Sequence, residues 1–190
     1  MAKWVMRKFM IDIERAKITP GWMYESELET LAKWSNRYPS IHNRIIEVGS
    51  WMGRSTRAIC DNSGAVVICV DAWKPTKEAP DWDFELAYKE FHENLRDHID
   101  SGRLIIFQGD SVETAHELVK VYGKRYADMV FLDAGHNYEY IRDDILAYKP
   151  LVKIGGLLCG HDYNWPGVEQ AVKELLPNFT LSGNMWVMEV

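Results

Sequence analysis

The chain has 190 residues, of which 47% are hydrophobic, and this length suits one hydrophobic core better than two. Its 22 basic and 28 acidic residues give a formal charge of −6, which argues against nucleic acid partners because these require basic surfaces. No stretch approaches the roughly 20 consecutive apolar residues of a membrane span, and the N-terminus lacks the apolar core of a signal peptide, so we expect a cytoplasmic protein without a membrane partner.

Short β-branched runs alternate with helix-length amphipathic segments along the chain. A helical N-terminal segment is expected over residues 1–40. The expected strands cover residues 44–49, 65–73, 103–111, 127–136 and 155–163, with a closing pair of strands in 179–190. The expected helices cover residues 54–63, 84–98, 112–123, 139–152 and 167–177.

The predicted strands are continuous apolar runs, which favours a parallel sheet covered by helices on both faces. We therefore predict a doubly wound α/β fold, with a mainly parallel seven-stranded sheet that ends in an antiparallel strand pair. We see no linker that would divide the chain, so residues 1–190 are predicted to form one domain. In such sheets, ligands bind beyond the carboxyl ends of the strands.

Every strand that precedes the closing pair ends in an acidic or small polar group. These groups are Glu47, Asp71, Asp110, Asp133 and the pair His161–Asp162. One acid in a loop is common, whereas five such tips on the edge where ligands bind are a stronger signal. By contrast, the odd set of cysteines lies in or beside apolar runs without metal-like spacing. Cys60, Cys69 and Cys159 are therefore predicted to be buried free thiols.

The loop after the first strand, EVGSWMGRST, does not fit the known phosphate-binding patterns. Gly49 and Gly53 enclose three residues instead of four, and Arg54 replaces the lysine of the nucleotide-phosphate loop. Thr56 stands where the dinucleotide pattern has its third glycine. Glu47 would repel a polyphosphate, so the loop favours a ligand that carries a positive charge and hydroxyl groups.

An adenosine with a cationic amino-acid tail meets these demands. Asp71 is placed to accept hydrogen bonds from ribose hydroxyls, and Asp110 with Ser111 is placed to bind the adenine amine. Glu47 would face an ammonium or sulfonium group. The alternative interpretation is that the two glycines allow tight packing and that Asp71 caps a turn, but the cofactor interpretation accounts for all of these positions together.

The pattern Glu47-x-Gly49-x-x-x-Gly53, with Asp71 and the run 109–111, resembles the S-adenosylmethionine site of class I methyltransferases. The stretches GWMYESELETL, EVGSWMGRST, FLDAGHNYEYIRDDILAYKPLVKIGG and GHDY resemble a metal-assisted branch that includes macrocin O-methyltransferases and cephalosporin-hydroxylase-like proteins. The resemblance implies a single Rossmann-like methyltransferase domain over 1–190. The cofactor-binding residues it implies are Glu47, Gly49, Ser50, Gly53, Ser55, Asp71, Trp73, Asp110, Ser111 and Asp133.

Asp133 and His161 are 28 residues apart, about one strand–helix–strand crossover. If their strands are neighbours, Asp133 lies beside His161 and Asp162, and these three residues are predicted to hold a divalent metal. The resemblance implies Mg²⁺, although relatives often have an oxygen donor where this chain has His161. Imidazole is less suited to Mg²⁺ than to Mn²⁺, Fe²⁺ or Zn²⁺, so Mn²⁺ is expected beside Mg²⁺ and the identity of the metal stays open.

His136 is the candidate catalytic base because imidazole titrates near neutral pH, and Asp133 is assigned to catalysis beside it. Tyr138 is predicted to orient His136 or the substrate. The alternative is that His136 and His161 form hydrogen bonds within loops. Asp143 and Asp144 are predicted only to cap or solvate the next helix.

Residues 74–92 are too long for a tight turn and form either a lid over the site or a surface excursion. Trp4, Trp22 and Trp51 are expected in a pocket wall or in an oligomer contact, with core packing favoured for at least one of them, and a homo-oligomer is a further expectation.

The predicted function is S-adenosylmethionine-dependent O-methylation of a small hydroxylated acceptor, a sugar or natural product, with help from a divalent metal. The alternatives are a small-molecule binding protein or hydroxylase-like enzyme on the same fold, and a metal-free methyltransferase that uses His136. A nicotinamide reductase is the least favoured function, because the third glycine of the dinucleotide pattern is missing and an acid, Glu47, already stands at the end of the first strand.

Overall fold

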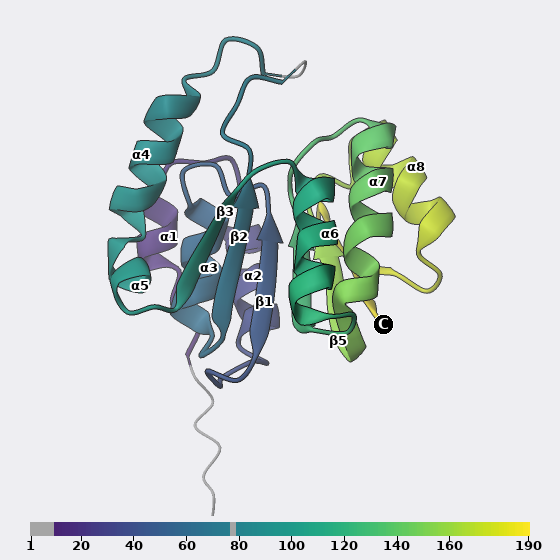
Figure 1. Cartoon of the computed structure of the whole chain (residues 1–190), viewed down its shortest axis with the longest axis horizontal. Helices are drawn as coiled ribbons and strands as arrows, with labels where there is room; N and C mark the ends of the chain where they lie inside the picture. Colours follow the sequence, from purple (N-terminus) through teal and green to yellow (C-terminus); the bar gives the residue numbers. More distant parts are fainter. Residues whose placement is uncertain (1–9, 77–78) are drawn as a thin grey trace, which may run out of the picture.

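The computed structural model describes residues 10–76 and 79–190 (Figure 1). Trp4, the start of the expected N-terminal helical segment and residues 77–78 of the possible lid lie outside the described residues. The strands are β1 Arg44–Val48, β2 Val66–Asp71, β3 Leu104–Gln108, β4 Ala127–Leu132, β5 Val152–Gly160, β6 Thr180–Ser182 and β7 Met185–Glu189. The helices are α1 Glu14–Ile18, α2 Glu25–Ser35, α3 Arg54–Asn62, α4 Phe84–Asn94, α5 Arg96–Asp100, α6 Ser111–Tyr122, α7 Tyr138–Tyr148, α8 Pro166–Leu175 and the 3₁₀ helix η1 Lys149–Leu151.

The strands form one seven-stranded sheet in the order β3-β2-β1-β4-β5-β7-β6. The pairs among β1 to β5 are parallel, and β7 pairs antiparallel with both β5 and β6. This arrangement confirms the predicted fold. After β3 the chain returns to β4 beside β1, so the winding direction switches between β1 and β4, where ligands bind in such sheets.

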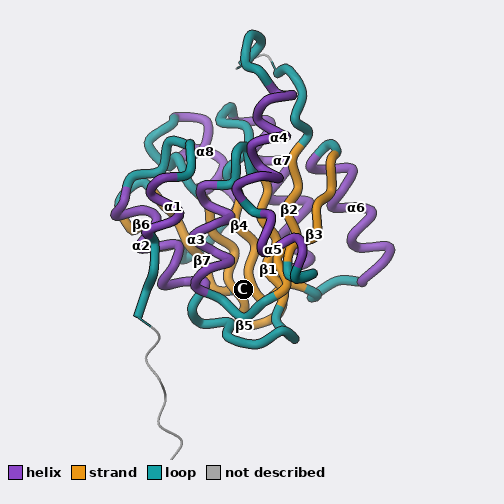
Figure 2. Tube along the Cα trace, turned by 90° about the vertical axis from the view of Figure 1, so that its left-hand side faces the viewer, coloured by secondary structure: helices purple, strands orange, loops and turns teal. Residues whose placement is uncertain are grey.

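Helices cover both faces of the sheet, and each face has its own hydrophobic core (Figure 2). On one face, residues such as Ile45 pack with α1 to α4, and on the other, residues such as Ile46 pack with α6 to α8. Because successive side chains point to opposite faces and both are buried, these strands require continuous apolar runs.

Side-chain caps set the starts of three helices. Asp83 caps α4, Asp110 caps α6 and Asn137 caps α7, each by accepting hydrogen bonds from N–H groups of the first turn. The single helix expected over 84–98 is instead two helices, α4 and α5, separated at the buried Leu95. Packing of Leu95 into the core overrides the continuous helical pattern of the sequence.

The three cysteines are buried and free, as predicted. Within the two described ranges, no helix is both long and apolar enough to cross a membrane.

The loop after β1 approaches the end of β4 closely at Gly49. This residue has φ of +85°, and a Cβ atom there would lie 2.1 Å from the carbonyl oxygen of Asp133. Both the left-handed backbone and the missing side chain are therefore required at this position.

We expect Gly49→Ala to lower the free energy of unfolding by roughly 2–4 kcal/mol, because a left-handed alanine and overpacking against Asp133 both contribute. Urea titration measures the loss. The matched control is Gly102→Ala, where φ is +72° but no atom lies within 4 Å of the new Cβ. The control should lose only the backbone contribution, and equal losses in both variants would contradict the close approach.

Candidate functional site

The hydrogen-bond ladder of the sheet extends one residue beyond four strands. In each case, the N–H of the first residue after one strand donates to a carbonyl at the end of its neighbour: Gly109 to Asp71 (2.9 Å), Gly49 to Val70 (2.8 Å), Asp133 to Val48 (2.8 Å) and His161 to Leu132 (3.1 Å). These bonds hold the residues predicted at the strand tips along one edge of the sheet.

Asp71 organises the glycine loop. Its Oδ2 atom accepts hydrogen bonds from the N–H groups of Ser50 and Trp51, and its Oδ1 atom accepts one from Trp73, all at 2.9 Å. A carboxylate offers about four acceptor sites, so the backbone uses three of them. The side chain is half-buried at the tip of β2 and shapes the loop, and its predicted contact with a ribose stays a prediction.

Glu47 lies beneath this loop and is fully buried. Its Oε2 atom accepts hydrogen bonds from the hydroxyls of Ser50 (2.9 Å) and Thr56, and from the thiol of Cys69 (3.3 Å). Burial raises the pKa of Glu47, and the hydroxyl donors oppose that rise. Within the described chain, Oε1 has no hydrogen-bond partner. Glu47 therefore supports the loop from inside.

Other predicted cofactor residues also support the loop. Ser50, Ser55 and Trp73 are buried, and Nε1 of Trp73 donates to the carbonyl of Trp51 at 2.9 Å. A Cβ atom at Gly53 would lie 2.7 Å from Leu95, so this glycine serves close packing. Their roles toward a cofactor stay predictions.

Arg54, which replaces the lysine of a phosphate loop, serves the N-terminal segment. Its guanidinium donates to the carbonyls of Met23 (2.9 Å), Lys17 and Thr19 (both 2.7 Å). These three bonds tie the segment before α2 to the start of α3. The arginine is thus committed to the backbone, which agrees with the absence of a phosphate-loop pattern.

At the tip of β3, Asp110 caps α6, and the hydroxyl of Ser111 donates to Oδ1 of Asp144 at 2.5 Å. Asp144 is buried, so the expectation that it only caps or solvates a helix is wrong, whereas Asp143 pairs with Arg142 at 2.7 Å. Burial raises the pKa of Asp144 to about 7; the Ser111 hydroxyl opposes the rise, and the charges of Asp110 and Asp143 add to it.

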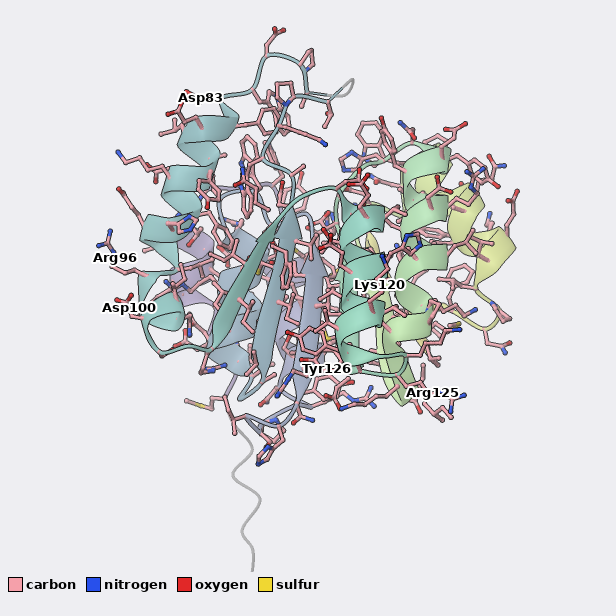
Figure 3. All side chains as sticks on the ribbon, in the orientation of Figure 1. Asp83, Arg96, Asp100, Lys120, Arg125 and Tyr126 are labelled. Carbon is pink, nitrogen blue, oxygen red and sulfur yellow. The ribbon has the colours of Figure 1, made fainter. Side chains whose placement is uncertain are left out.

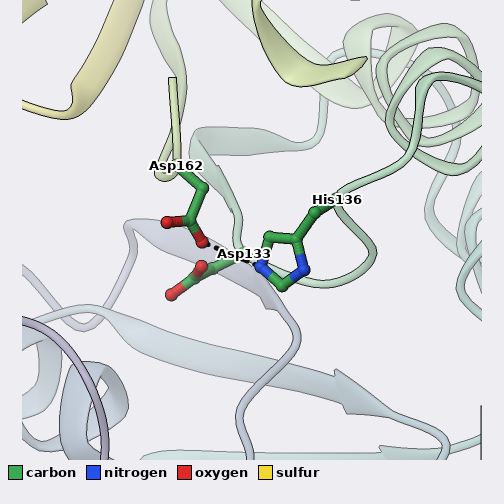
Figure 4. A group of neighbouring side chains, drawn as sticks. All are labelled: Asp133, His136 and Asp162. Carbon is green, nitrogen blue, oxygen red and sulfur yellow. Dashed lines mark ion pairs between the residues drawn. The ribbon is translucent and has the colours of Figure 1, made fainter. Parts of the chain in front are cut away.

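The tips of β4 and β5 bring two acids and a histidine together (Figure 4). Nε2 of His136 lies 2.8 Å from Oδ2 of Asp162, and Asp133 lies beside them. Asp133, His136 and Asp162 each offer a ligand atom within 4.8 Å of the others, the one such group in the described part of the chain. The structure thus brings His136 beside the two acids, and the metal set predicted from the sequence, with His161, stays a prediction.

His161 lies behind the two carboxylates. Its Nδ1 atom is 3.2 Å from Asp162 and 3.6 Å from Asp133. Burial opposes charge on the ring, but hydrogen bonds and charges of Asp133 and Asp162 outweigh burial and raise the pKa of His161 to about 11. Although burial opposes it, contact with His136 and His161 holds the pKa of Asp162 well below its usual range.

Glu27 of α2 completes this arrangement and was missed in the sequence. Its Oε1 atom lies 3.1 Å from Nε2 of His161, and its Oε2 atom accepts a hydrogen bond from the N–H of Tyr24 at 2.7 Å. The available signal was an acid next to Leu28 on the apolar face of α2, because buried acids require partners.

Two aromatic contacts shape the surroundings of His136. The ring of Trp165 stacks on the His136 ring, with centroids 4.9 Å apart and planes at 26°. The hydroxyl of Tyr138 donates to Glu174 of α8 at 2.6 Å. Trp165 therefore contacts the His136 ring directly and the hydroxyl of Tyr138 is engaged with α8, while a role of Tyr138 toward His136 or the substrate stays a prediction.

A tryptophan cluster, Trp22, Trp51 and Trp82, joins the N-terminal segment, the glycine loop and the possible lid. The ring of Trp82 lies 4.8 Å from Trp22 and 4.9 Å from Trp51, and Trp22 lies 5.5 Å from Trp51. Residues 84–92 of the possible lid belong to α4. The lid role stays a prediction.

Strained backbone occurs at the edge of the sheet that carries the candidate site. Trp51, Trp73 and Asp162 have φ of 46°, 41° and 57°, in the left-handed region that side chains rarely adopt. Such strain persists only where the surrounding structure enforces it, and it often accompanies functional sites.

A family model described as a methyltransferase domain matches residues 46–163. No curated protein matches the chain by sequence. Among solved structures, the chain is similar to the calicheamicin methyltransferase CalS11, with 14% identity, TM-score 0.64, 86% of this chain and 77% of that chain covered. It is similar to a putative caffeoyl-CoA O-methyltransferase from Staphylococcus aureus, with 15% identity, TM-score 0.63, 88% of this chain and 83% of that chain covered. It is also similar to an O-methyltransferase from Bacillus cereus in complex with SAH, with 12% identity, TM-score 0.64, 91% of this chain and 84% of that chain covered. These structural likenesses show a shared fold.

The raised pKa of Asp144 predicts a pH effect on stability. Between about pH 4 and 7 the folded protein keeps a proton that the unfolded chain releases, so the free energy of unfolding falls as pH rises. From pH 5 to 8, wild type should lose roughly 2–3 kcal/mol more than Asp144→Asn in urea titrations, at 1.36 kcal/mol per pKa unit. Glu117→Gln, which removes an exposed acid of α6 that does not contribute to the shift, should behave like wild type. Parallel curves for wild type and Asp144→Asn would refute the assignment.

Proposed function

The chain belongs to the methyltransferase domain family, and from this premise we propose that it transfers the methyl group of S-adenosylmethionine to a hydroxyl oxygen of a small acceptor such as a sugar or natural product. The sulfonium methyl is a strong electrophile, so the protein has to align it with the acceptor oxygen and remove the hydroxyl proton. In the reaction the sulfur–carbon bond breaks, a carbon–oxygen bond forms and S-adenosylhomocysteine leaves.

The observation that carries the proposal is the loop organised by Asp71 at the switch between β1 and β4. Gly49, with φ of +85°, brings backbone close to this edge, and Asp71 keeps an acceptor site beyond its three backbone bonds. Glu47 is fully buried beneath the loop, so it serves the site by holding the loop from inside and does not face the ammonium or sulfonium group as the sequence predicted. Asp110 and Ser111 lie at the next tip and are proposed for the adenine.

The second element is the cluster of Asp133, His136 and Asp162, which fits a divalent cation such as Mn²⁺. Two carboxylates and one imidazole are a donor set that Mn²⁺ accepts more readily than Mg²⁺ does. When bound, the cation would lower the pKa of an acceptor hydroxyl. The carboxylates supply the negative charge, and His136 provides the nitrogen donor.

The contact between His136 and Asp162 favours a second candidate, metal-free methyl transfer. A carboxylate 2.8 Å from an imidazole orients the ring and stabilises its charged form. In that case His136 takes the hydroxyl proton as general base, and Asp133 lies beside the reacting oxygen.

Calorimetric titration of S-adenosylmethionine tests the cofactor site. Wild type should bind saturably, and Asp71→Ala should bind roughly tenfold more weakly or worse, because hydrogen bonds to a charged group contribute about 1.5–3 kcal/mol. The control is Asp100→Ala, on the outer surface of α5 away from α6 to α8 (Figure 3). Absence of binding to folded wild type would refute the proposal.

Calorimetric titration of Mn²⁺ separates the two candidates. If the cluster holds a cation, Asp133→Asn and Asp162→Asn should each weaken binding at least about tenfold, since each removes a charged ligand. Asp143→Asn, an exposed acid outside the cluster, should bind as wild type does. Saturable S-adenosylmethionine binding without Mn²⁺ binding would refute the metal-assisted candidate and favour the His136 base.

A further inference from the structure

We propose that Glu27 and His161 are positioning residues that hold Asp162 and Asp133 in place at the acceptor side of the site. This inference rests on the proposed function in one respect, namely that the two carboxylates serve the acceptor. It assigns a role to two side chains that contact neither cofactor nor acceptor.

The four side chains form a continuous chain of acids and imidazoles. His136 lies 2.8 Å from Asp162, Asp162 lies 3.2 Å from His161, and His161 lies 3.1 Å from Glu27. This row of four side chains starts in the loop between β4 and α7, passes through the tip of β5 and ends in the first turn of α2. It therefore connects three elements that are distant in sequence.

The exposed fraction of the side chains falls along this row, from His136 to Glu27. The side chain of His136 is 31% exposed, those of Asp162 and Asp133 are 19% and 18%, and those of His161 and Glu27 are both 8%. The inner pair lies behind the carboxylates, out of reach of a small molecule at the edge. Any influence of Glu27 on the chemistry must therefore act through His161 and the two acids.

The charges explain why the inner pair is needed. Two carboxylates at adjacent strand tips repel each other, and the imidazole of His161 lies within 3.6 Å of both. Its far nitrogen faces Glu27, at ion-pair distance although not aligned as a hydrogen bond. Glu27 thus balances the charge on the far side of the ring and limits the ring's rotation.

Glu27 is itself a fixed anchor. Its second oxygen accepts the hydrogen bond from Tyr24 in the capping box of α2, and the adjacent Leu28 is fully buried. Asp162 is held at its other oxygen by Nδ2 of Asn184 (3.3 Å) and has φ of 57°. The carboxylate is therefore constrained from both sides. We expect a substitution at Glu27 to loosen only the contact between Asp162 and His161, and to leave the contact between Asp162 and Asn184 in place.

The test compares Glu27→Gln with Glu29→Gln. Glutamine keeps an oxygen for the N–H of Tyr24 but removes the charge facing His161. Glu29 lies in the same helix, is 53% exposed and pairs with Lys33, so its substitution is the matched control. Mn²⁺ affinity should fall roughly 10- to 100-fold in Glu27→Gln and stay unchanged in Glu29→Gln, as is usual when a partner of a metal ligand is removed.

A second pair of variants separates the two ring nitrogens of His161. Asparagine places its amide donor near the position of Nδ1, and glutamine places it near that of Nε2. His161→Asn should therefore retain more Mn²⁺ affinity than His161→Gln, because Asn keeps a donor toward Asp162. The opposite order would overturn the inference. Thermal unfolding of each variant establishes that it is folded.

The ring ¹⁵N NMR signals of His136 at one fixed pH give a readout that needs no metal, with assignment from His136→Gln. Glu27→Gln should shift them and Glu29→Gln should not, because Glu27 contacts His161, which in turn contacts Asp162. If wild type binds no Mn²⁺, the metal-assisted function fails and this signal alone decides the role of Glu27. Unchanged His136 signals in folded Glu27→Gln would overturn the inference, whichever function holds.

Discussion

The backbone ladder across the strand tips is the constraint on which the candidate site depends. The N–H of Asp133 donates to Val48, and that of His161 donates to Leu132. Because side chains alternate between faces, a shift of either strand by one residue would place a different side chain at the tip. Gly49 secures the register between β1 and β4, since a side chain there has no room beside Asp133. The site geometry is thus fixed by backbone before any side chain acts.

Bringing acids to one edge creates an electrostatic problem, and the protein solves it in three ways. Glu47 is surrounded by hydroxyl donors and a thiol beneath the loop, and burial raises its pKa. Asp144 keeps a proton near neutral pH beside Ser111. Asp162 stays charged between two imidazoles, which lower its pKa. The third arrangement leaves an anionic side chain partly exposed at the edge, and it lies where the acceptor is proposed to bind.

The sequence predicted the sheet and the edge because strand tips follow directly from apolar runs and parallel topology. It did not predict which of two adjacent residues faces outward: His161 points toward α2, and the left-handed backbone of Asp162 turns that side chain toward His136. Nor did it find Glu27, whose partner lies 134 residues later in the chain. Patterns within one segment report burial, whereas a contact between segments depends on how they pack.

The space between His136 and the two acids explains why two chemistries suit one site. The Nε2 side of the His136 ring faces Asp162 (Figure 4), so this nitrogen shares a proton with the carboxylate when the imidazole is protonated there. A cation held by the same three side chains would need a ring nitrogen of His136 as a lone-pair donor, and binding at Nε2 would displace that proton. In the proposed function, the metal-assisted and metal-free reactions would thus be alternative states of one cluster. Glu27 and His161 lie behind the carboxylates in both states, which is why their positioning role does not depend on the choice between them.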